Sequence, residues 1–130
     1  MANQSDLLGV GLSWPAAERL GYSPTTYTAV AGVTAQSGAK ALGSKLSLLS
    51  VASATGNAFL LPANPPTGVV MYCVNLFASV ATAQVFAATN NLLNGTTNTA
   101  VTLTTGQAAL FVSVAAGTAA ACNWYSIKTA

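Results

Sequence analysis

The sequence contains no histidine, and Asp6 and Glu18 are its only acidic residues. General acid–base catalysis usually employs histidine or a tuned carboxylate, and nucleophilic triads need a base beside the nucleophile. A paired-carboxylate glycosidase would depend on these two acids alone. Gly9 and Gly11 lack the later Gly and Lys of a phosphate-binding loop. The sequence therefore predicts a protein that is not an enzyme.

Charge is scarce throughout the chain. Residues 46–127 contain no Asp, Glu, Lys or Arg, and the whole chain is 5% charged, whereas an ordinary domain is about 25% charged. Lys40 and Lys45 are too few to form the basic patch that binds nucleic acid, so no nucleic-acid partner is expected. A surface without charge also lacks the repulsion that keeps isolated domains soluble. We therefore expect a homo-oligomer.

Long uninterrupted apolar runs and metal-ligand clusters are also missing. The N-terminus has no basic region preceding an apolar run, so no secretory signal is expected. Thr, Asn, Ser, Gly and Pro interrupt the uncharged stretch before about 20 apolar residues accumulate, which predicts no membrane span. Cys73 and Cys122 alone cannot form a zinc site, and no cofactor is expected. They are expected to be buried free thiols, and a disulfide requires that their strands be neighbours.

The first 45 residues differ in composition from the rest, because they hold every charged side chain except that of Lys128. We expect residues 1–45 to form an extended N-terminal arm. A short helix is predicted near residues 15–20, with Ser13 as its cap and Gly21 as its stop. Residues 22–38 are predicted to be extended.

From residue 46 onward, short apolar stretches recur between turn signals, which is typical of strands. Residues 68–77 are apolar on nearly both faces, as a central strand would be, and Asn94-Gly95 predicts a hairpin turn. The pattern predicts an all-β domain over residues 46–130, an antiparallel sandwich or jelly roll of about seven or eight strands. Its outward faces are expected to carry Thr, Ser, Asn, Gln and Ala. The predicted strands are 46–51, 57–61, 68–77, 81–88, 100–104, 108–114 and 122–128.

The aromatic residues of the arm are candidates for contact with a partner, because Trp and Tyr are favoured interface anchors. The alternative is that they pack the arm against its own domain. Trp124 and Tyr125, in the last predicted strand, are expected in the core or in a subunit interface. The candidate partner-interface residues are Leu7, Leu8, Leu12, Trp14, Tyr22 and Tyr27.

The order of motifs after residue 46 is similar to that of small virion proteins of tailed bacteriophages. The resemblance covers residues 46–128. It is carried by the segments NAFLLP, GVVMYCVNLF, ATAQVFAA, LLNGTTNTAVTLTTGQAALFVSV and NWYSI. It implies a trimer of β-sandwich or jelly-roll subunits on the outside of the head. By position, Asn94-Gly95 would be the hairpin turn, residues 110–112 a core strand and Trp124 part of the closing strand.

This resemblance implies a capsid decoration (cement) protein, made in the host cytoplasm and located on the capsid surface of the virion. Its partners would be copies of itself and the major capsid protein, with no nucleic acid and no membrane involved. The principal alternative is a host-recognition fibre or spike module that binds surface glycan. A self-assembling shell protein is a third possibility, which the small size of the chain disfavours.

Overall fold

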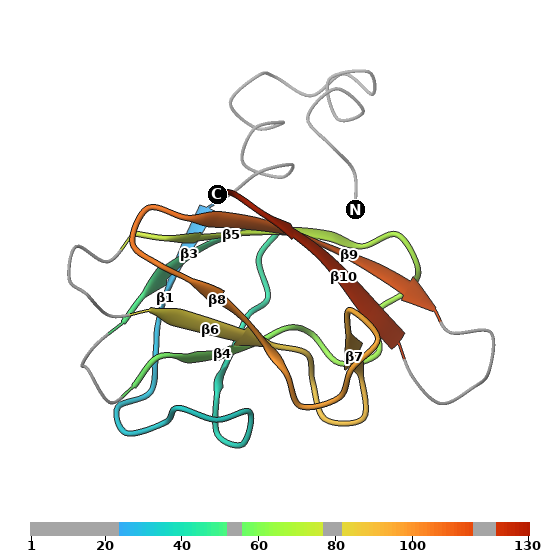
Figure 1. Cartoon of the computed structure of the whole chain (residues 1–130), viewed down its shortest axis with the longest axis horizontal. Helices are drawn as coiled ribbons and strands as arrows, with labels where there is room; N and C mark the ends of the chain where they lie inside the picture. The colour runs from blue at the N-terminus through green and yellow to red at the C-terminus, as the bar shows by residue number, and fades with distance from the viewer. Residues whose placement is uncertain (1–23, 52–55, 77–81, 116–121) are drawn as a thin grey trace.

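The computed structural model describes residues 24–51, 56–76, 82–115 and 122–130, which form ten strands in two layers (Figure 1). Sheet A has six strands in the order β1-β3-β5-β9-β10-β7, and sheet B has four in the order β2-β4-β6-β8. Both sheets contribute to one apolar core. The strands are β1 (Pro24–Thr28), β2 (Lys40–Ala41), β3 (Leu46–Ser50), β4 (Ala58–Leu60), β5 (Val70–Asn75), β6 (Ala83–Phe86), β7 (Leu92–Leu93), β8 (Ala100–Leu103), β9 (Ala108–Ala115) and β10 (Cys122–Lys128).

The first six strands alternate between the two sheets. β1, β3 and β5 are parallel neighbours in sheet A, and β2, β4 and β6 are parallel neighbours in sheet B. Parallel strands need a long crossover connection, and here a strand of the opposite sheet lies within each crossover. The chain therefore winds through three turns, each of which gives one strand to each sheet.

The last strands close this winding with antiparallel pairs. β9 pairs with β5 and β8 pairs with β6, so both sheets are extended on the side of the third turn. β10 then pairs antiparallel with β9, and the short β7 runs parallel to β10.

The predicted antiparallel sandwich or jelly roll is therefore wrong. The chain is mostly β, as expected, but both sheets mix parallel and antiparallel pairs. An antiparallel sheet is often built from consecutive strands that pair, whereas β9 and β10 are the only strands consecutive in the described chain that pair with each other. The side-chain period of a strand shows which residues point inward but does not identify the strand beside it.

The core lies between the two sheets and is built from alternate residues of their strands. β9 shows the pattern, because Ala109, Phe111 and Ser113 are buried while the residues between them are partly exposed. Trp124 of β10 is the largest fully buried side chain. Other buried side chains that fill this core include Leu49, Phe59, Leu61, Met71, Cys73, Val85, Leu93 and Leu103.

Two buried polar side chains add hydrogen bonds to those of the backbone. Asn75 of sheet A donates from Nδ2 to the carbonyl of Leu103 in sheet B, at 2.9 Å. Ser113 Oγ donates to the carbonyl of Pro66 at 2.6 Å and accepts from the amide of Val69 at 2.9 Å. Since a buried polar group is costly when unpaired, these bonds favour one arrangement of the sheets and of the chain entering β5.

The predicted arm overlaps the described structure in part. β1 and β2 precede residue 46 and occupy edges of the two sheets, where they pair with β3 and β4. The helix predicted near residues 15–20 lies outside the described residues. The Asn94-Gly95 turn is confirmed, because both residues have positive φ and Leu93 pairs with Thr96 across them. Within the described ranges, no helix is long and apolar enough to cross a membrane.

Gly56 marks a close approach between successive turns of the winding. A Cβ at this buried position would meet the Val30 carbonyl oxygen and would lie 2.9 Å from Ala31 Cα. Replacing Gly56 by Ala should lower the free energy of unfolding by about 1–3 kcal/mol, because backbone atoms must shift to accept the methyl group. Urea unfolding of the parent and variant measures this difference.

Gly43→Ala is the matched control for this substitution. A Cβ at Gly43 would meet only the Tyr27 hydroxyl, at an ordinary 3.6 Å. Its stability should stay within about 0.5 kcal/mol of the parent, as for other exposed positions. Equal stabilities of the two variants would contradict the close backbone contact at Gly56.

Candidate functional site

The described part of the chain offers little for charge-based chemistry. Its charged side chains are those of Lys40, Lys45 and Lys128, and the described residues contain no cluster of three His, Cys, Asp or Glu side chains. Lys128 Nζ donates to the carbonyl of Thr102 at 3.2 Å. The features of the described residues that could bind a partner are therefore surfaces and hollows.

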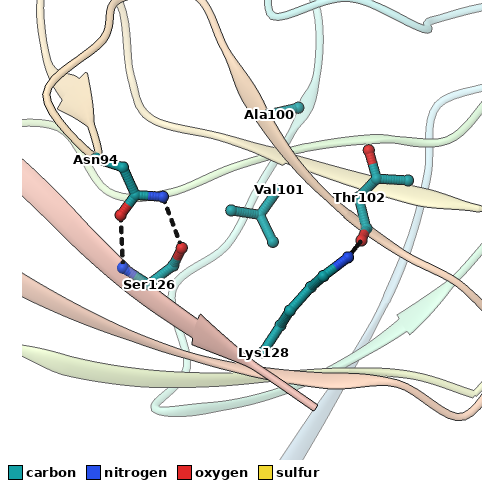
Figure 2. Close-up of a pocket in the computed structure, with 6 residues that line it drawn as sticks. All are labelled: Asn94, Ala100, Val101, Thr102, Ser126 and Lys128. Carbon is teal, nitrogen blue, oxygen red and sulfur yellow. Dashed lines mark hydrogen bonds between the residues drawn. The ribbon is translucent and has the colours of Figure 1, made fainter. Parts of the chain in front are cut away.

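One polar hollow of about 390 Å³ lies between β8 and β10. Figure 2 shows Asn94 facing Ser126 across two hydrogen bonds, from Ser126 N to Asn94 Oδ1 at 2.9 Å and from Asn94 Nδ2 to Ser126 Oγ at 2.8 Å. The stem of Lys128 crosses the hollow toward Thr102 (Figure 2). These polar groups satisfy one another, so the hollow is held together by internal contacts.

The outward face of sheet A is a broader feature and is largely apolar. Its residues align in rows across the strands: Leu46 pairs with Tyr72, Tyr72 with Leu110, and Leu110 with Ile127. We call the outward side of β3, β5, β9 and β10 the sheet A outer face. Its members are Leu46, Leu48, Ser50, Val70, Tyr72, Val74, Ala108, Leu110, Val112, Val114, Asn123, Tyr125 and Ile127.

Several large side chains of the sheet A outer face are open to solvent. Ile127 is 74% exposed, Tyr125 51% and Tyr72 37%. A hollow of about 350 Å³ lies on this face, and its lining includes Leu46, Tyr72, Leu110 and Ile127. Lys128 also borders it, with its Nζ bonded to the Thr102 carbonyl. No member of the face carries a charge. A contiguous exposed apolar surface of this kind typically marks an interaction site.

This surface differs from the sequence prediction, which placed Thr, Ser, Asn, Gln and Ala on the outward faces. For sheet A that prediction is wrong, because Leu, Val, Ile and Tyr predominate there. The signal was present in residues 68–77, which are apolar at inward and outward positions alike. A strand buried on one side by the core and apolar on the other predicts a second partner surface.

Of the predicted interface residues, Tyr27 lies in the described structure. It belongs to β1, is half-buried and packs against the core. Its hydroxyl accepts from the amide of Gly43 at 3.0 Å and lies 3.0 Å from Ser44 Oγ. Tyr27 thus positions the chain that enters β3, and its role in an interface stays a prediction. The other candidates lie outside the described residues. They are Leu7, Leu8, Leu12, Trp14 and Tyr22.

The two cysteines are free and buried. Cys73 is on β5 and Cys122 on β10, with β9 between them. Two strand spacings amount to about 9.6 Å, beyond the roughly 7 Å between Cα atoms that a disulfide tolerates. Burial raises the pKa of Cys73 to about 12. Burial also raises the pKa of Cys122, against the opposing effect of a hydrogen bond from the Val114 backbone.

Comparison of the chain with protein-family models, with curated proteins and with solved structures found no match. The sheet A outer face therefore stands as the candidate functional site on its own geometry.

The raised pKa of Cys73 predicts that stability falls in alkaline solution. The unfolded thiol ionises near its ordinary value of 9.0, whereas the folded thiol stays protonated up to about 12. Between these values the folded state binds one more proton, so rising pH favours unfolding by about 1.4 kcal/mol per pH unit. Urea unfolding at pH 8 and pH 10.5 should show this loss.

Cys73→Ala is the control, because it removes this proton but leaves the lysines, tyrosines and Cys122 in place. Between the two pH values the parent should lose about 2 kcal/mol more stability than the variant does. Parallel pH profiles for the two proteins would contradict the assignment to Cys73.

Proposed function

We propose that this chain is a structural virion protein that decorates and stabilises a bacteriophage capsid as a homo-oligomer, with a trimer favoured. The observation that carries the proposal is the sheet A outer face, an uncharged and mainly apolar surface that is contiguous across four strands. Burying such a surface against another protein requires no desolvation of charge. The resemblance of residues 46–128 to small phage virion proteins supports the choice of a virion as the setting.

The proposed mechanism is stabilisation by mass action. A protein that binds the assembled shell but not its separated subunits adds a binding free energy to the assembled state alone. The two mixed β-sheets with their shared core form the rigid part of the proposed decoration protein. The N-terminal residues, with their charges at Asp6, Glu18 and Arg19, are the part proposed to reach the major capsid protein.

Particles of the encoding phage test the proposal directly. Purified particles should contain this chain at a fixed ratio to the major capsid protein. Particles made without it should release their DNA at a lower temperature and regain stability when the purified protein is added back. Absence of the chain from purified particles, or equal heat stability with and without it, would sink the proposal.

Removal of residues 1–21 tests whether these residues attach the protein to the capsid without being needed for folding. The truncated protein should keep its strand signal in circular dichroism and its oligomeric mass, since β1 begins at Pro24. Its occupancy on capsids, measured by co-sedimentation, should fall well below that of the full chain. Equal occupancy would show that the N-terminal residues do not attach the protein to the shell.

A glycan-binding host-recognition module is the second candidate, favoured by the exposed rings of Tyr72 and Tyr125 on one face. Aromatic rings supply flat apolar surface with a polar hydroxyl at one end. However, the hollow beside Tyr72 is lined mainly by aliphatic side chains, whereas sugar hydroxyls need polar partners. Glycan binding by the purified protein that is lost in Tyr125→Ala would favour this candidate over decoration.

A further inference from the structure

We infer that copies of this chain associate with one another through the sheet A outer face. This deepens the homo-oligomer of the proposed function and rests on it, because it names the surface and the partner. The occupant of the face is a second copy of the same chain.

The absence of charge suits a contact between identical faces. In a symmetric assembly, identical residues approach one another near the axis, so a charge there would face a copy of itself. Like charges at about 4 Å repel by several kcal/mol where water is partly excluded. The outward positions of β3, β5, β9 and β10 carry no charge at all, which makes this face compatible with its own copy.

The shape of the face also suits a contact with its own copy. The sheet A outer face combines a hollow, lined by Leu46, Tyr72, Leu110 and Ile127 among others, with the exposed ring of Tyr125, which is not part of that lining. Buried aromatic and aliphatic anchors that fill pockets dominate the energetics of protein interfaces. A copy of the same face supplies such anchors and such a hollow at once.

Residues 1–23 are the competing cover, because they join the described structure at Pro24, which pairs with Leu46 at the end of one row of the face. This segment combines apolar side chains such as Leu7, Leu8 and Trp14 with the charges of Asp6, Glu18 and Arg19. The outward strand positions of the face carry no charge to pair with those three, whereas a second copy of the face brings no charge with it. Removal of residues 1–23 distinguishes the two occupants.

The area of the sheet A outer face determines how strongly two copies are expected to associate. Four strands about 4.8 Å apart and roughly 20 Å long present on the order of 400 Å². A standard interface buries about 800 Å² per partner, so this contact belongs to the smaller class. Association should therefore depend on protein concentration, and one introduced charge should be enough to abolish it.

Sedimentation equilibrium of the full chain across a range of concentrations tests the inference. The parent should exceed the 13.0 kDa mass of a single chain, and Ile127→Glu and Tyr125→Glu should each return it to that mass. Both side chains are at least half exposed in the single chain, so the fold should survive. Circular dichroism and urea unfolding check this, and Ile127→Ser is the milder variant if either glutamate variant unfolds.

Thr102→Glu is the matched control, because Thr102 is an exposed strand residue of sheet B. It adds the same charge outside the face and should leave the oligomeric mass unchanged. Removing residues 1–23 should also leave the mass unchanged. A parent that stays at 13.0 kDa, an oligomer that survives both face variants, or an oligomer lost with residues 1–23 would each overturn the inference.

This test is independent of the virion assay. If the face variants dissociate the oligomer but the chain is absent from particles, the inference stands and the decoration function falls. If the chain stabilises particles while the face variants remain oligomeric, the function stands and the inference falls.

Discussion

The apolar core shared by the two sheets is the interaction on which the rest of the structure depends. Each turn of the winding sends one strand to each sheet, and neither strand buries its inner side chains unless the opposite sheet covers them. Phe59 from sheet B and Phe111 and Trp124 from sheet A are fully buried in this layer. The contact therefore holds the parallel pairs together even though no helix connects them in the described chain.

Much of the fold could be predicted from the sequence, and the part that could not has a definite physical cause. Short apolar stretches between turn signals placed the strands near 46–50, 70–75, 108–115 and 122–128 within a few residues. Strand pairing was not predictable in the same way, because alternation encodes the face of a residue and not its neighbour. β3 lies beside β5 only because β4 crosses to the other sheet between them.

The candidate site was predictable only in part, for a related reason. Tyr27 was identified as an aromatic residue of the arm, but its hydroxyl is engaged by Gly43 and Ser44. The members of the sheet A outer face come from four strands that are separated in sequence and adjacent in space. Once the order β3-β5-β9-β10 is known, Leu46, Tyr72, Leu110 and Ile127 fall into one row. The scarcity of charge in the sequence then corresponds to one particular surface, the uncharged sheet A outer face.

The arrangement of the first three turns has a consequence for how such a chain can change length. β1 and β2 each form one edge of their sheets, while the closing strands lie beyond β5 and β6, with β9, β10 and β7 in sheet A and β8 in sheet B. A tandem duplication of one complete turn would add one parallel strand to each sheet without altering the partners of the closing strands. The architecture is thus modular at one end, and the domain could be lengthened in steps of roughly one turn.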